Sequence, residues 1–186
     1  MEQVTINAYR FDELTEKAKE RAMEWINEST FSDSFWSESV TDDAKTIGAI
    51  LGLYIDSIYW DQYLFVTIDA HYSYAKGWKK KLKEYAPNDE DLLIIGQDLQ
   101  DLQKHVKWPY QWKYWARINE KGRNGMGIES DFPELDNNLA DIVEEFCRWI
   151  SRNLRKESDY LESEEYMLEA AEANNWRFDE KGRIIR

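Results

Sequence analysis

The chain has 186 residues, and its 37 acidic side chains against 24 basic ones give a formal net charge of -13 at pH 7. Such a charge repels phosphate groups and argues against a bulk surface that holds a nucleic-acid backbone. The length fits one domain with a sizeable core, and we predict a single domain over residues 1–186. One cysteine excludes an intramolecular disulfide, and Cys147 lies in an amphipathic run typical of a buried, unreactive thiol.

The sequence shows no sign of export or of a membrane segment. The N-terminus has neither the basic start nor the apolar run of a secretory signal. No apolar stretch approaches the roughly 20 residues that a membrane span needs. We therefore expect a soluble, cytoplasmic protein that does not contact a membrane.

Two helices are predicted in the N-terminal part of the chain. Residues 4–9 first alternate as a short strand. Thr15 then stands at an N-cap position before an apolar stripe at helical spacing. The stripe consists of Leu14, Ala18, Ala22, Trp25 and Ile26. A second helix is expected from about Ser34 to Leu51, with Gly52 placed to end it.

The middle of the chain has strand-like patterns. We predict strands over residues 53–60 and 63–74, followed by helices over 77–85 and 89–106. In the second strand the apolar face comprises Leu64, Val66, Ile68, Ala70 and Tyr72, and the polar face comprises Tyr63, Thr67, Asp69, His71 and Ser73. This alternation is typical of an antiparallel strand with one buried face.

The C-terminal part continues the mixture of strands and helices. The expected elements are a hairpin of residues 110–119 and 126–130, a helix over 138–160, a helix from Ser163 to about Asn174, and a terminal hairpin of residues 176–178 and 183–185. Together the patterns predict an α+β fold, in which helices pack against a small, mostly antiparallel sheet.

No pattern in the chain predicts catalysis. Asp69 and His71 lie two apart on one strand face, where a carboxylate could orient an imidazole as a general base, but no nucleophile accompanies them. The two histidines lack the spacing of metal ligands, and no phosphate-binding glycine motif is present. We therefore predict no catalytic residue, no metal site and no cofactor.

Cations alternate with aromatic residues over residues 104–117, as a stacking platform for bases requires. On a strand, Lys113, Trp115 and Arg117 would share one face, although packing against helices explains the same pattern. A possible ligand-binding set, for a small nucleotide or a protein loop, consists of Trp60, Tyr63, Asp69, His71, Lys113, Trp115 and Arg117.

Carboxylates recur at helical spacing in two tracts. The partner-binding residues that we predict are Glu13, Glu16, Glu20 and Glu24 in the first tract, and Glu162, Glu165 and Glu169 in the second. Rows of surface carboxylates can imitate DNA phosphates and occupy the cleft of a DNA-binding enzyme, although they are also found on ordinary solvated helix faces.

Several segments resemble a family of small phage and prophage proteins of mostly unknown role, often described as antitoxin-like. The similar segments are residues 9–19, 36–52, 55–60, 83–87 and 173–178. The resemblance implies a phage setting, and hence a host-cell cytoplasm, but no catalytic residues.

These observations favour a phage- or prophage-encoded accessory protein that acts by stoichiometric binding. The leading hypothesis is an acidic inhibitor of a host defence nuclease or CRISPR-type effector. The expected partner is a host protein with a basic surface, and no direct contact with a nucleic-acid backbone is expected. The alternatives are an antitoxin-like partner of a toxin and a nucleotide-binding sponge.

Overall fold

The computed structural model describes residues 7–32, 34–104, 111–119, 122–130 and 136–185, and between 111 and 136 it describes the backbone only. The described chain forms two compact units. Unit 1 comprises Met1–Glu38 and Lys156–Arg186, and unit 2 comprises Ser39–Arg155. Each unit has its own buried core. The prediction of one domain over residues 1–186 stays a prediction.

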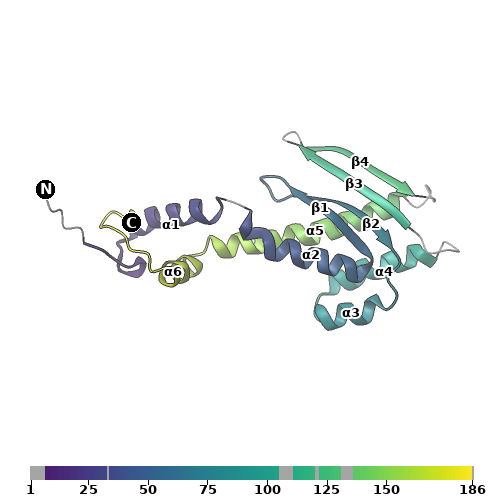
Figure 1. The fold of residues 1–186 in the computed structure, drawn as a ribbon, viewed down its shortest axis with the longest axis horizontal. Coiled ribbons are helices and arrows are strands. Elements are labelled where there is room, and N and C mark those ends of the chain that lie inside the picture. The colour runs from purple at the N-terminus through teal and green to yellow at the C-terminus, as the bar shows by residue number, and fades with distance from the viewer. Residues whose placement is uncertain (1–6, 33, 105–110, 120–121, 131–135, 186) are drawn as a thin grey trace. The chain divides into compact units, whose positions relative to one another are not determined.

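The described elements agree with the predicted α+β class (Figure 1). In chain order they are η1 (Phe11–Glu13), α1 (Glu16–Thr30), η2 (Phe35–Ser37), α2 (Glu38–Leu51), β1 (Leu53–Trp60), β2 (Val66–Ser73), α3 (Trp78–Tyr85), α4 (Glu90–Lys104), β3 (Gln111–Asn119), β4 (Gly122–Ser130), α5 (Asp136–Leu161) and α6 (Glu164–Ala173).

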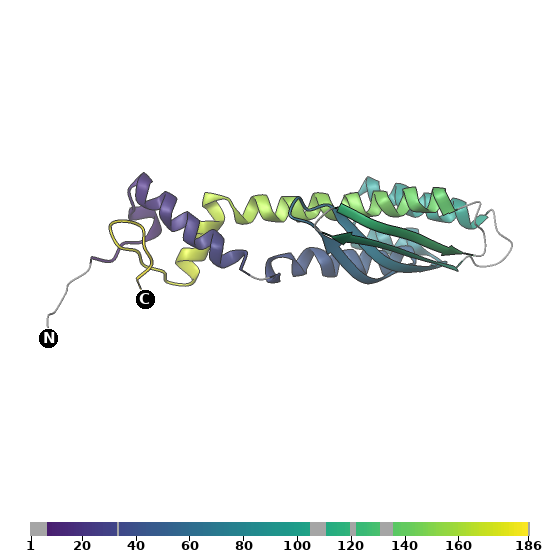
Figure 2. The same cartoon turned by 90° about the horizontal axis from the view of Figure 1, so that it is seen from above.

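Unit 2 is built on an antiparallel sheet with the strand order β1-β2-β3-β4. The β1–β2 register runs from Leu53 opposite Tyr72 to Trp60 opposite Val66, with a bulge at Asp56. Helices pack on this sheet, as Figures 1 and 2 show. Val66, Ile68, Ala70 and Tyr72 of β2 are buried, which confirms the predicted apolar face.

The prediction that Thr67 lies on the polar face of β2 is wrong, because only 2% of this residue is exposed. The predicted start of this strand at Tyr63 is also wrong. Asp61 Oδ1 accepts hydrogen bonds from the backbone N–H groups of Tyr63 (2.8 Å) and Phe65 (3.0 Å), while Leu64 takes a positive φ of 58°. This tight loop ends the extended conformation, so that β2 begins at Val66.

Gly52 ends α2 as predicted, and its backbone explains why. Its φ is +90°, and an added Cβ would lie 2.3 Å from the carbonyl oxygen of Ser73. The Ser73 N–H donates to the Gly52 carbonyl (2.9 Å), so the end of β2 holds the helix-to-strand turn. Only glycine fits both the conformation and the close approach.

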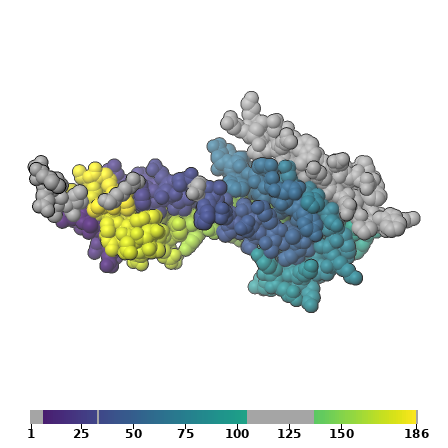
Figure 3. All heavy atoms as spheres, viewed as in Figure 1, coloured from purple at the N-terminus to yellow at the C-terminus, as the bar shows by residue number. Residues whose placement is uncertain are grey.

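Unit 1 packs α1 and α6 around an apolar core, and Figure 3 shows its C-terminal segment (yellow) lying against its N-terminal segment (purple). The buried core residues are Phe11, Leu14, Ala18, Ala22, Ile26, Met167, Ala171 and Phe178. Phe178 forms antiparallel bridges to both Tyr9 and Ile184. The predicted terminal hairpin is therefore present as a single bridge. Residues 4–6 of the predicted opening strand lie outside the described residues.

The two predicted N-caps of unit 1 differ. Ser163 Oγ accepts a hydrogen bond from the Tyr166 N–H (3.2 Å), as an N-cap of α6 should. Thr15 occupies the N-cap position of α1, but its hydroxyl makes no capping bond. Only its backbone carbonyl takes part in the helix, where it accepts hydrogen bonds from the N–H groups of Ala18 and Lys19 at 2.8 Å each.

Asp179 stabilises the terminal turn and makes the stability of unit 1 pH-dependent. Its carboxylate accepts from the N–H groups of Arg183 (2.9 Å) and Lys181 (2.9 Å), and from the Arg183 guanidinium (2.7 Å). The Arg183 backbone hydrogen bond is the largest influence that lowers the pKa of Asp179, to about 2. A lowered pKa stabilises the fold above the unfolded-state pKa of about 4, and this contribution is lost as the pH falls toward 2.

We therefore expect Asp179→Asn to flatten the pH dependence of the free energy of unfolding between about pH 4 and pH 2. Denaturant titrations at several pH values in this window measure it. Glu180→Gln, an exposed neighbour, is the control and should keep the wild-type slope. The same slope in Asp179→Asn and wild type would contradict this account.

Candidate functional site

The carboxylates that we predicted to bind a partner all lie in unit 1, which brings the two acidic tracts into one compact body. We define the acidic surface as the exposed side chains of Glu13, Glu16, Glu20, Glu24, Glu162, Glu165 and Glu169. Lys19 of α1 links the two tracts, because its Nζ lies 3.0 Å from Glu164 Oε1 and 3.8 Å from Glu16 Oε1. The hydrogen bond to Glu164 raises the pKa of Lys19.

Part of the acidic surface is engaged in local contacts. Glu13 accepts from the Arg10 N–H (2.8 Å), and Glu162 from the Ser158 hydroxyl (3.3 Å). Glu169 accepts from the Tyr160 hydroxyl (3.1 Å), and this bond raises the pKa of that tyrosine. These carboxylates are less free to meet a partner.

Three carboxylates of the acidic surface remain free. Within the described part of the chain, Glu20, Glu24 and Glu165 have no hydrogen-bond or ion-pair partner. Because they lack a cation of their own, their field extends into solvent. They are the members of the acidic surface best placed to contact a basic partner.

The charge is unequally divided between the two units. Unit 1 contains 18 acidic and 9 basic residues, a net charge of -9, whereas unit 2 contains 19 and 15, a net charge of -4. Unit 1 is also the smaller of the two. The acidity of the chain is therefore concentrated in the unit that carries the acidic surface.

The outward face of β1 and β2 in unit 2 carries a second group of polar and aromatic side chains. His71 stacks on Tyr54, with ring centroids 5.3 Å apart and an interplanar angle of 17°. His71 Nδ1 also lies 3.6 Å from Asp56 Oδ2. The Tyr59 hydroxyl donates to Asp69 Oδ2 at 3.4 Å.

Asp69 and His71 therefore have separate partners on β1. The carboxylate beside the imidazole is that of Asp56, which the bulge in β1 brings within reach of β2. Sequence reasoning missed Tyr54, Asp56 and Tyr59. The alternation of Tyr54 and Asp56 was a visible signal, but the bulge shifts Tyr59 out of it, and only the β1–β2 register pairs the three residues with β2.

The other predicted ligand residues are only partly brought together. Trp60 ends β1 and is half-buried, while Tyr63 projects from the loop with 64% of its surface exposed. Lys113 lies opposite His71 in the β2–β3 register. Beyond their backbone in β3, Lys113, Trp115 and Arg117 lie outside the described residues, so this part of the predicted set stays a prediction.

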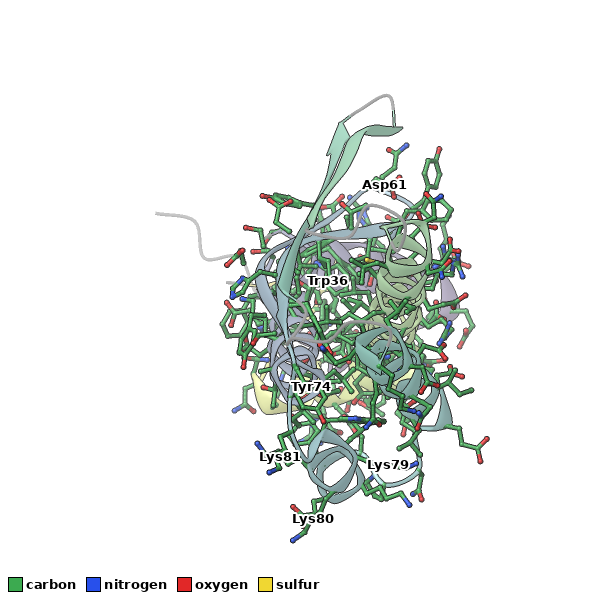
Figure 4. All side chains as sticks on the ribbon, turned by 90° about the vertical axis from the view of Figure 1, so that its right-hand side faces the viewer. Trp36, Asp61, Tyr74, Lys79, Lys80 and Lys81 are labelled. Atoms are coloured by element: carbon green, nitrogen blue, oxygen red, sulfur yellow. The ribbon has the colours of Figure 1, made fainter. Side chains whose placement is uncertain are left out.

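The lysines between residues 76 and 83 lie on α3 and just before it. Trp78 and Leu82 are buried and anchor the helix, while Lys76, Lys79, Lys80, Lys81 and Lys83 are exposed. Figure 4 shows Lys79, Lys80 and Lys81 spreading outward from the helix. The lysines thus lie on unit 2, whereas the acidic surface lies on unit 1.

Sequence reasoning also missed a row of arginines on α5. Arg148, Arg152 and Arg155 follow one another at four- and three-residue spacing, which places them on one face of the helix. All three line a cavity in unit 2. Their spacing was visible in the sequence, but the residues opposite them come from the β1–β2 loop.

The fold and these surfaces define an α+β protein with an acidic helical unit. The chain belongs to the family described as Domain of unknown function (DUF8835), whose model matches residues 36–164. No curated protein and no solved structure matches the chain. The matched residues include all of unit 2, but of the acidic surface only Glu162.

Among the described residues, no helix combines the length and the apolar character needed to cross a bilayer.

Proposed function

We propose that the chain acts by stoichiometric binding, with the acidic surface of unit 1 docked on a basic surface of a host protein. An inhibitor of a host defence nuclease or CRISPR-type effector, encoded by a phage or prophage, fits best, because such enzymes line their clefts with Lys and Arg to hold phosphates. The main support is that Glu20, Glu24 and Glu165 are exposed and have no ion-pair partner among the described residues. They belong to a unit with a net charge of -9.

The spacing of the carboxylates along α1 supports the proposal that they imitate the phosphates of DNA. Glu16, Glu20 and Glu24 succeed one another every four residues, which corresponds to about 6 Å along the axis of α1. One strand of duplex DNA places a phosphate about every 3.4 Å of axis. The carboxylates of the α1 row therefore recur at about twice the spacing of the phosphates along a DNA strand, and Glu165 of α6 adds a further charge.

The magnitude of such contacts determines their role. An exposed ion pair contributes about 0.2–1 kcal/mol, so three carboxylates supply at most about 3 kcal/mol. Interfaces of useful affinity need further contacts. The acidic surface would therefore set the orientation and the rate of association, and select partners with a basic cleft.

The first test is an inhibition assay against a panel of purified defence nucleases and CRISPR-type effectors. We expect the chain to block DNA cleavage by one panel member at a one-to-one ratio, and excess duplex DNA to relieve the block by competing for the cleft. A panel on which the chain inhibits no enzyme would contradict the proposal.

The second test reverses charge on the acidic surface. Glu20→Lys with Glu24→Lys should weaken binding to the inhibited enzyme by about 100-fold, because two attractions become repulsions of similar size. Asp42→Lys with Glu84→Lys is the matched control, since it changes the net charge equally on exposed residues of unit 2. Titration calorimetry measures both, and equal losses in the two variants would show a general charge effect instead of a binding surface.

A further inference from the structure

Unit 2 contains a cavity of about 530 Å³ between the β1–β2 loop and α5. Its size lies within the range of about 300–1,000 Å³ that small-molecule sites occupy. Val66 and Cys147 contribute buried apolar surface to its lining. Phe65 adds an aromatic ring that is 59% exposed. Apolar surface next to charged side chains is what a ligand with both an apolar body and a charged group requires.

The cavity is formed in advance of any ligand. The Ser151 hydroxyl donates to the Leu64 carbonyl, and the Arg155 guanidinium donates to the Tyr63 carbonyl at 3.0 Å. Asp61 closes the loop itself by accepting from two of its backbone N–H groups. These bonds fix the loop on α5, so a ligand would not have to order it.

Three guanidinium groups and two carboxylates contribute to the lining. Arg148 pairs with Glu144 and Glu145, and Arg152 pairs with Asp91. These two arginines are therefore neutralised by neighbouring acids.

Arg155 differs from the other two arginines of the cavity. Among the described residues it has no carboxylate partner, and it bonds only the Tyr63 carbonyl. Its Cζ lies 5.6 Å from the centroid of the Phe65 ring. The remaining N–H groups of its planar fork suit a carboxylate or a phosphate. A cation beside an exposed aromatic ring matches a ligand that combines an anionic group with a flat apolar body.

We infer that this cavity binds a small anion with a flat apolar body, such as a nucleoside monophosphate. The charged group pairs with Arg155, and the apolar body lies against Phe65, Val66 and Cys147. The site is separate from the acidic surface and does not depend on the proposed inhibition.

Titration calorimetry with adenosine 5′-monophosphate tests the inference, with 1-anilinonaphthalene-8-sulfonate as an aromatic anion that is not a nucleotide. We expect one-to-one binding of at least one of the two probes below about 1 mM, which corresponds to about -4 kcal/mol. Adenosine, which lacks the anion, and inorganic phosphate, which lacks the apolar body, should each bind at least about tenfold more weakly than the monophosphate.

Variants at the cavity separate a specific site from general adsorption. Arg155→Gln should weaken binding of the probe at least about tenfold, and Phe65→Ala should weaken it as well. Arg155→Lys, which keeps the charge but loses the fork, should fall between Arg155→Gln and wild type. Lys80→Gln, a loss of positive charge on exposed α3, is the matched control and should bind as wild type. Thermal unfolding of each variant verifies that it is folded.

The outcomes decide the inference. Binding of the sulfonate alone keeps the site and assigns it to aromatic anions other than nucleotides. The inference is overturned if neither probe binds saturably, if adenosine binds as well as its monophosphate, or if Arg155→Gln and Phe65→Ala both bind as wild type.

Discussion

Replacing Gly182 with alanine is expected to destabilise unit 1 by at least about 3 kcal/mol. Gly182 has a φ of +78°, and an added Cβ would lie 1.9 Å from the carbonyl oxygen of Ala18 in α1. The left-handed conformation costs a non-glycine residue about 1–2 kcal/mol. The clash with helix backbone adds more, because the terminal turn must move away from α1 and open the packing around Phe178.

Gly77→Ala is the matched control for this prediction. Gly77 has the same φ of +78°, but an added Cβ would meet no atom within 4 Å. It should therefore lose only about 1–2 kcal/mol, the cost of the backbone conformation alone. The free energy of unfolding, from denaturant titrations followed by tryptophan fluorescence, measures both variants. Equal losses at Gly182 and Gly77 would show that the turn does not press against α1.

Phe146→Ala should destabilise unit 2 by about 3–5 kcal/mol, the usual cost of removing a buried aromatic side chain. Phe146 of α5 is fully buried and stacks on Trp149 with ring centroids 5.9 Å apart. Its removal leaves a cavity in a core that cannot fully collapse, since β2 and α4 also contribute buried residues to that core.

The control for Phe146 is Ile94→Ala on α4, where 60% of the side chain is exposed. This change should cost less than about 0.5 kcal/mol, as surface substitutions usually do. The same denaturant titrations compare the two variants. A loss below about 1 kcal/mol for Phe146→Ala would contradict the assignment of α5 to the core of unit 2.

The elements of the fold were predictable where the signal was local. Of the predicted stripe, Trp25 is partly buried and the other four residues, Leu14, Ala18, Ala22 and Ile26, are buried. The left-handed backbone of Gly52 and the hydroxyl cap at Ser163 also depend on residues within one or two turns of the helix. Such features need no knowledge of distant contacts, which is why a sequence pattern is sufficient to find them.

The errors arose where side-chain or long-range contacts override the pattern. The alternating pattern predicted that β2 begins at Tyr63. The hydrogen bonds to the Asp61 carboxylate instead hold residues 63–65 in a loop, so β2 begins at Val66. The same alternation placed Thr67 on the polar face, but the residue is buried. A sequence pattern indicates whether a residue is polar or apolar, but it does not show which helices or strands pack over that residue.

The candidate sites show the same division. Helical spacing predicted that Glu20, Glu24 and Glu165 are exposed, and they are. That α1 and α6 pack into one unit, with Lys19 bonded to Glu164, depends on contacts between the two ends of the chain. The position of Arg155 beside the Phe65 ring was equally invisible, because its neighbours come from the β1–β2 loop.

The central claim is that the free carboxylates of unit 1 bind a basic surface, and one measurement tests it most directly. It is the dissociation constant of the complex with the inhibited enzyme, determined at low and high salt for wild type and for Glu20→Lys with Glu24→Lys. Raising the salt from about 50 to 300 mM shortens the screening length and should weaken wild-type binding at least about tenfold. The variant should bind weakly at both concentrations. The claim would be contradicted if wild type and the double variant bound the enzyme with equal affinity and salt changed neither affinity.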